Sequence, residues 1–233
     1  MGLLDEVVVT DENKDVVNTI MCMGQSHKMP VRMFVYGPAG SGKTTLFQAR
    51  GRERDLMSEK MMTYVHAEEI VAALNLPEEV GERVLERVGS TTVLFLDGFD
   101  KFFDHGEFGT KIIHALLSVR NESGLETLLA SDIPYDELPE AGTKGVIDSY
   151  LRVELKPLDN EGKKQLVRQV AVSQGRAKDN PVTIAEDAVD YIIDNYGDDF
   201  DSIRNVTKFL VTAAGFEDGT VVDAALAQEA MSR

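Results

Sequence analysis

Short apolar runs alternate with helical patterns along the first two thirds of the chain. Five runs predict buried strands, at Val31–Tyr36, Met62–His66, Val93–Leu96, Thr127–Ala130 and Leu151–Leu155. Apolar residues at helical spacing predict helices at Thr44–Leu56, Glu68–Leu74, Pro77–Val88 and Thr110–Arg120. Strands separated by helices form right-handed βαβ units, so this pattern predicts an α/β fold with a parallel sheet covered by helices on both faces.

The pattern changes at Pro157. Beyond it only helical signatures follow, at Asn160–Gln174, Ile184–Asn195, Asp199–Ala214 and Val222–Met231. Gly197 stands where the second of these helices should stop. The sequence therefore predicts two domains, an α/β domain over residues 1–156 and a small all-helical domain over 157–233.

Composition limits the function classes. With 24 Lys and Arg against 40 Asp and Glu among 233 residues, the formal charge is −16, which disfavours DNA binding through a broad basic face. A local cradle for a single phosphate group is compatible with that charge, because backbone N–H groups and one lysine act at short range. Cys22 is the only cysteine, and no signal segment or membrane span is recognisable, so we expect a soluble cytoplasmic protein.

The strongest chemical motif follows the first predicted strand. Residues 37–44, GPAGSGKT, match the phosphate-loop pattern G-x-x-x-x-G-K-[ST] between a buried strand and a helix. The loop consists of Gly37, Pro38, Ala39, Gly40, Ser41, Gly42, Lys43 and Thr44. Its glycines let successive N–H groups point at a β-phosphate, Lys43 reaches the β- and γ-oxygens, and the Thr44 hydroxyl ligates Mg²⁺. We count Thr45 among the residues that contact the nucleotide.

A second acidic motif closes the third predicted strand. Val93–Leu96 is followed by Asp97, the arrangement that brings a Walker B aspartate to the carboxyl edge of a parallel sheet, where it holds Mg²⁺ through a water. The next position, where hydrolysing proteins of this class place a second acid, is Gly98. Asp100 is three residues on from Asp97, and we expect it to point elsewhere.

Two further residues have alternative interpretations. Asp132 follows the fourth strand and approaches the γ-phosphate if that strand lies between the two phosphate-binding strands; otherwise Ser131 and Asp132 only start a turn before Pro134. Arg204 lies on a predicted helix of the second domain among Asp198, Asp199 and Asp201. On local grounds it forms a solvated ion pair within its helix; a second interpretation comes from the family resemblance described next.

Taken together, these residues resemble the AAA+ ATPases, and within them the bacterial replication initiator (DnaA) family in its short, Hda-like form without the DNA-binding domain. Beyond the phosphate loop, the similar stretches are Tyr64–Glu69 (YVHAEE), Leu128–Leu138 (LLASDIPYDEL), Leu155–Leu158 (LKPL) and Ser202–Val206 (SIRNV). The resemblance implies a five-stranded parallel αβα sandwich and a helical lid. It also implies ATP or ADP with Mg²⁺ as ligands, sensor 1 at Asp132 and sensor 2 at Arg204.

Departures from the family pattern shape the expected activity. Where the family carries an arginine finger, just before the fifth strand, only Lys144 and Arg152 are cationic, and Arg152 falls within the strand. Gly98 replaces the second acid, so we expect slow or absent hydrolysis by catalytic residues Lys43, Asp97, Asp132 and Arg204. We find no Gln-led clamp-binding peptide near the N-terminus, and no helix-turn-helix follows the lid.

These features favour a nucleotide-dependent regulator or partner in DNA replication. Its expected partners are a replication initiator or another AAA+ protein, with self-assembly and without direct DNA binding or membrane attachment. The alternatives are a helicase loader, which needs an N-terminal helicase-binding segment, and a degenerate scaffold that retains the fold without using ATP. A metabolic phosphotransferase is disfavoured by the helical lid.

Overall fold

The chain divides into two compact units. The computed structural model describes residues 7–22, 31–55, 62–139, 143–177, 182–214 and 221–232. One unit, the sheet unit, comprises Asp15–Pro38 and Leu46–Leu155; the other, the helical unit, comprises Met1–Lys14, Ala39–Thr45 and Lys156–Arg233. Each is described by itself below, and the proposed domain boundary after residue 156 stays a prediction.

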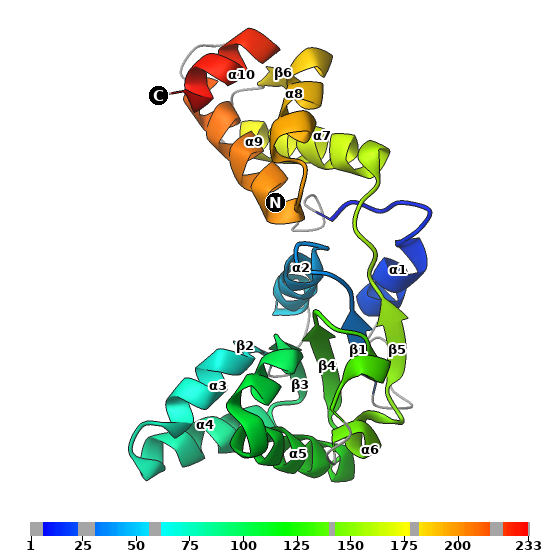
Figure 1. The fold of residues 1–233 in the computed structure, drawn as a ribbon, viewed down its shortest axis with the longest axis vertical. Helices are drawn as coiled ribbons and strands as arrows, with labels where there is room; N and C mark the ends of the chain where they lie inside the picture. The colour runs from blue at the N-terminus through cyan, green and yellow to red at the C-terminus, as the bar shows by residue number, and fades with distance from the viewer. Residues whose placement is uncertain are drawn as a thin grey trace. The chain divides into compact units, whose positions relative to one another are not determined.

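The sheet unit contains five parallel strands. They are β1 (Arg32–Tyr36), β2 (Met62–His66), β3 (Val93–Asp97), β4 (Glu126–Ser131) and β5 (Leu151–Glu154). Their order is β2-β3-β4-β1-β5 (Figure 1). The parallel αβα fold predicted from the sequence is therefore confirmed. In this order β4 lies between β3 and β1, the arrangement that one of the two interpretations of Asp132 requires. That insertion brings the carboxyl ends of β3, β4 and β1 side by side at one edge.

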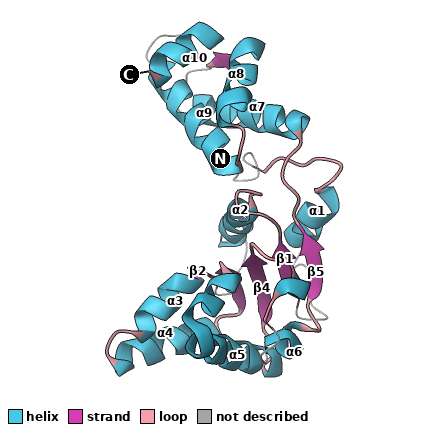
Figure 2. Ribbon diagram, in the orientation of Figure 1, coloured by secondary structure: helices cyan, strands magenta, loops and turns pink. Residues whose placement is uncertain are grey.

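Helices cover both faces of the sheet (Figure 2). The helices that lie wholly or mostly in the sheet unit are α1 (Lys14–Cys22), α2 (Lys43–Asp55), α3 (Ala67–Leu74), α4 (Glu78–Ser90), α5 (Gly106–Glu122) and α6 (Thr143–Ile147), with 3-10 turns η2 (Phe99–His105) and η3 (Tyr135–Glu137). Alternate strand residues point to opposite faces. Phe34, Leu96 and Leu129 join the core with α3, α5 and η2, whereas Phe95 packs against Phe47 of α2, with ring centroids 5.4 Å apart.

The helical unit is built on α7 (Asn160–Ala177), α8 (Glu186–Tyr196), α9 (Phe200–Ala214) and α10 (Ala224–Met231). Their apolar faces form a second core, to which the N-terminal stretch contributes Val8. Two-residue strands β6 (Thr183–Ile184) and β7 (Val221–Val222) pair in parallel, a detail that the helical periodicity did not predict. Among the described helices, none combines the length and apolarity needed to cross a bilayer.

A buried arginine ties the sheet unit together. The Arg120 guanidinium is fully buried and donates to the carbonyls of Val88 (2.8 Å), Thr91 (2.9 Å) and Glu126 (2.5 Å) and to the Thr127 hydroxyl (2.9 Å). Burial lowers the pKa of Arg120 to about 10, so it remains protonated at neutral pH. It thereby joins the end of α4 to the starts of β3 and β4.

Candidate functional site

The phosphate loop starts at the carboxyl end of β1. The Gly37 N–H donates to the Ser131 carbonyl at 3.2 Å, which fixes the first residue of the loop against β4. The Leu155 N–H donates to the Tyr36 carbonyl at 2.7 Å on the other side of β1. Both neighbouring strands therefore anchor the point at which the loop leaves the sheet.

The rest of the loop packs within the helical unit. Gly40 has φ +75° and Gly42 has φ +93°, a left-handed conformation that favours glycine. A Cβ on Gly40 would lie 2.4 Å from Cβ of Asp199, and the Gly40 carbonyl accepts a 3.0 Å hydrogen bond from the Phe200 N–H. These two positions require glycine for conformation, and Gly40 also requires it for space.

Asp199 is held in place where the loop meets α9. Its carboxylate accepts hydrogen bonds from the N–H (2.8 Å) and the hydroxyl (2.6 Å) of Ser202. These bonds lower the pKa of Asp199 below its ordinary value. Asp199 therefore caps the start of α9 as an ionised carboxylate while its side-chain carbon lies against Gly40.

Helix α2 begins within the loop, at Lys43. Its N-terminus presents backbone N–H groups and the positive end of the helix dipole, the usual requirements for an anion site. Lys43 is only 6% exposed, and its Nζ lies 3.4 Å from the Ser41 hydroxyl. The lysine side chain is thus folded back over the loop.

Arg204 lies beside the start of α2 and also takes part in an ion pair. Its Nη1 donates to the Thr45 hydroxyl at 3.3 Å and lies 3.6 Å from Oδ1 of Asp201. The ion pair within the helix is therefore present, beside a contact with the residue that follows the phosphate-loop motif. Its predicted role as sensor 2 stays a prediction.

Asp97 ends β3 in a polar setting. Its Oδ2 accepts a 2.7 Å hydrogen bond from the Tyr64 hydroxyl, and its Oδ1 accepts from the Gly98 N–H at 3.0 Å. Its carboxylate is therefore oriented from both sides. Tyr64, which faces Asp97 from β2, was not recognised as a site residue from the sequence; the signal was its position two residues before the end of the neighbouring strand.

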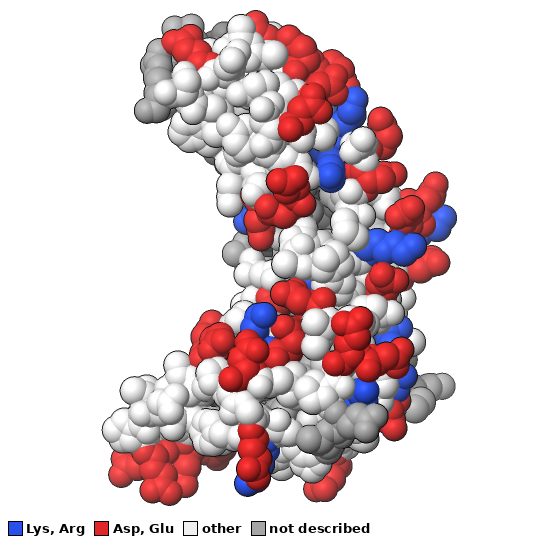
Figure 3. Space-filling view, viewed as in Figure 1, with Lys and Arg blue, Asp and Glu red and all other residues white. Residues whose placement is uncertain are grey.

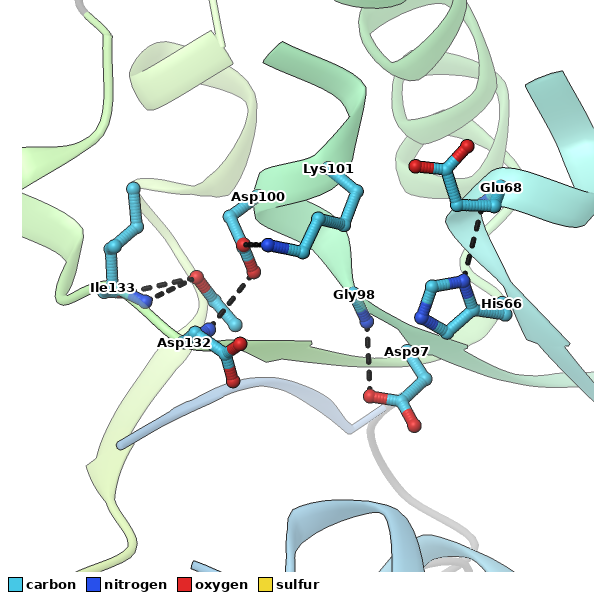
Figure 4. Close-up of polar contacts among 9 residues, drawn as sticks. His66, Glu68, Asp97, Gly98, Asp100, Lys101, Asp132 and Ile133 are labelled. Carbon is cyan, nitrogen blue, oxygen red and sulfur yellow. Dashed lines mark hydrogen bonds and ion pairs between the residues drawn. The ribbon is translucent and has the colours of Figure 1, made fainter. Parts of the chain in front are cut away.

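A side chain at position 98 would require a left-handed backbone and a shift of the His66 ring. The φ of Gly98 is +66°, and a Cβ built on it would lie 2.6 Å from Nε2 of His66 (Figure 4). The His66 ring is fixed because its Nδ1 accepts the Glu68 N–H at the start of α3. The position of the His66 ring therefore favours glycine at position 98.

Asp100 holds the residue that follows β4. It is 8% exposed and pairs with the Lys101 ammonium at 3.1 Å, while its Oδ1 accepts the Asp132 N–H at 2.9 Å (Figure 4). Burial alone would raise the pKa of Asp100, but these partners outweigh it and the pKa is lowered. Asp100 therefore belongs to a fixed contact between η2 and β4, as its expected orientation away from Asp97 suggested.

The two cations before and within β5 are engaged locally. The Arg152 guanidinium stacks 3.4 Å above the Tyr135 ring and lies 3.0 Å from the Asp148 carboxylate. The Lys144 ammonium donates to the Asp136 carbonyl at 3.0 Å. Arg152 lies in β5, as predicted, and neither contact involves the phosphate loop.

Metal ligands form no cluster of three or more His, Cys, Asp or Glu within the part of the chain that the structure describes. A magnesium site of the predicted kind does not need one, because Mg²⁺ takes one or two protein oxygens together with water and phosphate. Thr44 and Asp97 stay the predicted magnesium residues.

The sheet order, together with a glycine-rich loop between β1 and α2, defines a P-loop protein of the AAA+ αβα class. The model of the AAA family, ATPases associated with various cellular activities, matches residues 33–155, and the chain belongs to this family. The predicted resemblance to DnaA is confirmed by a relative, the chromosomal replication initiator protein DnaA of Campylobacter jejuni, which is 24% identical over 210 residues, 87% of this chain.

Solved structures agree on the fold. Domain III of the Thermotoga maritima replication initiation protein DnaA superposes with a TM-score of 0.77 at 19% identity, over 98% of this chain and 94% of that one. AMPPCP-bound DnaA from Aquifex aeolicus gives a TM-score of 0.69 at 21% identity, over 90% and 64%. The chain spans less than half the length of the Campylobacter DnaA relative, 46% of it.

Proposed function

We propose that this chain binds ATP or ADP with Mg²⁺ through residues 37–45 and acts as a nucleotide-dependent regulator or partner in the initiation of DNA replication. The observation that carries the proposal is the loop itself. Gly40 and Gly42 are left-handed, a Cβ at Gly40 would clash with Asp199, and the buried Lys43 opens a 13-residue helix. This is a backbone cradle for phosphate.

The residues present fit a magnesium nucleotide. Loop N–H groups and Lys43 hold the β- and γ-phosphate oxygens, and Thr44 supplies a hydroxyl to Mg²⁺. Asp97 would hold the ion with a carboxylate that the Tyr64 hydroxyl and the Gly98 N–H orient. Bound Mg²⁺ neutralises phosphate charge. Asp132 and Arg204 report on the γ-phosphate, in keeping with the contact of Arg204 with Thr45.

Hydrolysis is expected to be slow. Water attack on the γ-phosphate depends on groups that orient the water and offset developing charge. The position after Asp97 is Gly98, closed by His66, and the nearby Asp100 is engaged by Lys101 and the Asp132 N–H. Loss of an arginine finger costs on the order of 10³-fold or more in rate. These features favour a switch rather than a motor.

The replication role is supported by the relatives. The matched relatives are replication initiators by name, and one solved neighbour carries AMPPCP, an ATP analogue. The proposed partners are a replication initiator or another AAA+ protein, including a second copy of this chain. Direct DNA binding is disfavoured by the charge of −16 and by the acidic side chains spread over the surface drawn in Figure 3.

Single-turnover chemistry tests the nucleotide proposal. Labelled Mg-ATP is mixed with excess protein, and bound ATP and ADP are separated over time for wild type, Lys43→Ala and Lys156→Ala, an exposed lysine that serves as control. We expect wild type and Lys156→Ala to bind and hold intact ATP for hours, and Lys43→Ala to lose binding. Equal retention by all three variants would contradict the proposed site, and rapid conversion to ADP would contradict the switch.

Recovery of partners tests the replication proposal separately. Tagged wild-type and Lys43→Ala proteins are crosslinked in native host cells, and the attached proteins are identified. We expect a replication initiator or another replication protein with wild type and less with Lys43→Ala. Absence of every replication protein would overturn this role while leaving nucleotide binding intact.

A further inference from the structure

An apolar groove runs between α4 and α5 of the sheet unit, apart from every residue assigned to nucleotide. Its volume is about 910 Å³. The residues that carry the argument lie on the two helices: Leu85 and Gly89 on α4, and Phe108, Ile112, Ala115 and Val119 on α5. Nothing in the proposed nucleotide function uses them.

The α5 wall of the groove is a continuous helical stripe. Phe108, Ile112, Ala115 and Val119 follow one another at intervals of four, three and four residues, which places them on one side of three helical turns, about 16 Å long. Phe108 is 50% and Val119 53% exposed. Apolar residues gathered in this way, unlike scattered ones, mark interaction surfaces.

The α4 wall carries no side chain at one position near the C-terminal end of the helix. Gly89 presents no side chain, and a Cβ placed there would meet only Cδ1 of Leu116, at 3.9 Å, within 4 Å. A partner side chain can therefore approach the α4 backbone at this point. A groove between two helices, with a glycine in one of its walls, has the shape that receives a third helix.

The border of the groove is acidic. On α4, Glu79, Glu82 and Glu86 lie on the groove side of the helix, whereas Arg83 and Arg87 lie about a quarter turn or more away by helical spacing. On α5, Glu122 follows Val119 by three residues, and the one lining cation, Lys111, pairs with Glu107 at 2.7 Å. Figure 3 shows acidic side chains gathered at the turn between α3 and α4.

We propose that this groove binds an amphipathic helix of another protein, with its apolar face between α4 and α5 and basic residues along its edges. Apolar contact supplies the affinity, with Phe108 as the aromatic anchor. Charge complementarity sets the orientation and excludes acidic helices. Nucleic acids and anionic lipids share the negative sign of the border and are repelled.

A pair of synthetic helices tests the proposal on the full chain. Both peptides have about 18 residues with leucines at helical i, i+4 and i+7 spacing; the polar face of one is lysine and that of the other glutamate. Binding is measured by fluorescence anisotropy of the labelled peptide at physiological salt. We expect the lysine peptide to bind and the glutamate peptide to show at least about tenfold weaker binding.

Two variants locate the binding. Gly89→Met fills the groove without changing charge, and Val119→Asp places a carboxylate on the apolar stripe. Each should weaken the lysine peptide by about tenfold or more, while Val172→Asp, an exposed valine of α7, should not. If the lysine peptide bound only by general electrostatic attraction to an acidic protein, Val119→Asp would strengthen its binding, because the substitution adds negative charge. Circular dichroism confirms that each variant is folded.

Two results would overturn the proposal. Lysine-peptide binding that is unchanged in both groove variants would place it elsewhere on the acidic surface. Sedimentation that shows concentration-dependent dimers of wild type, lost in Val119→Asp, would make the groove a contact between copies of this chain instead. Neither result bears on nucleotide binding, which is measured with Lys43→Ala.

Discussion

The hydroxyl of Tyr64 donates a 2.7 Å hydrogen bond to Oδ2 of Asp97 across the paired strands β2 and β3. Groups that orient a metal-binding carboxylate typically change metal affinity by about 10- to 100-fold when removed. We therefore expect Tyr64→Phe to raise the Mg²⁺ concentration needed for nucleotide binding within that range, with metal-free nucleotide binding unchanged. Magnesium titration at fixed nucleotide measures the effect. An equal loss with and without Mg²⁺ would mean that Tyr64 is only structural.

Gly40 tests the loop geometry. In Gly40→Ala the new methyl group would meet Asp199 at 2.4 Å in a left-handed backbone, so we expect nucleotide affinity to fall by at least about tenfold and stability to fall by about 1–3 kcal/mol. Gly145→Ala, where a Cβ meets nothing within 4 Å, is the matched control. Calorimetric titration and urea unfolding report the two quantities, and wild-type affinity in Gly40→Ala would refute the cradle.

If Arg204 contacts the γ-phosphate, it raises the affinity for ATP relative to ADP. Removal of a charge-assisted hydrogen bond costs about 1.5–3 kcal/mol, so Arg204→Ala should reduce the preference for ATP over ADP by about tenfold or more. Arg168→Ala, an exposed arginine of α7 paired with Glu186 at 2.7 Å, should leave the ratio unchanged. Equal loss of ATP and ADP affinity in Arg204→Ala would instead indicate a general electrostatic or structural role.

Arg120 determines the stability of the sheet unit. Arg120→Met leaves the Val88, Thr91 and Glu126 carbonyls without the donors they have now. Each buried acceptor that loses its donor costs about 1–3 kcal/mol, so the three carbonyls together predict a loss of at least about 3 kcal/mol. Chemical unfolding of Arg120→Met beside Arg168→Met, which changes an exposed ion pair worth about 0–1 kcal/mol, measures the difference. Similar destabilisation of both variants would show that the buried hydrogen bonds of Arg120 do not stabilise the sheet unit.

Asp100 gives the fold a pH dependence of known sign. Its pKa is lower in the folded protein than its ordinary value of 3.8, so its stabilising contribution is present above that value. It is lost as the pH falls through the lowered pKa. Asp100→Asn should therefore be less stable than wild type at neutral pH, and the gap should narrow in acid. Urea midpoints measured from about pH 7 to about pH 3 test this, with Asp11→Asn at an exposed position as control. A difference in midpoint between wild type and Asp100→Asn that stays constant with pH would show that protonation of Asp100 is not coupled to folding.

Periodicity predicted β1, β3 and β4 well because most or all residues of each strand are buried, whereas β2, also predicted, has one buried residue among five. It missed η2, since Phe99–His105 follows a glycine and has no full helical repeat. It also missed α1, whose start is defined by a reciprocal pair of hydrogen bonds between Thr10 and Asn13 rather than by a long apolar stripe.

The residues of the candidate site were likewise only partly predictable from the sequence. The loop from Gly37 to Thr44 is a contiguous motif and could be read directly. Tyr64 and His66 act on Asp97 and Gly98 through strand pairing, which aligns His66 with Asp97. The sequence alone does not specify which strands are neighbours, and the buried bonds of Arg120 join positions about 30 residues apart.

Val8, only 3% exposed, belongs to the same core as Leu166, although the two are 158 positions apart (166 − 8). During synthesis the ribosome delivers Val8 first and its core partners last. The sheet strands between them pair with shorter separations, so they can assemble while the N-terminal stretch still waits for α7 to emerge. The core of the helical unit can therefore close only after the strands of the sheet unit have been synthesised.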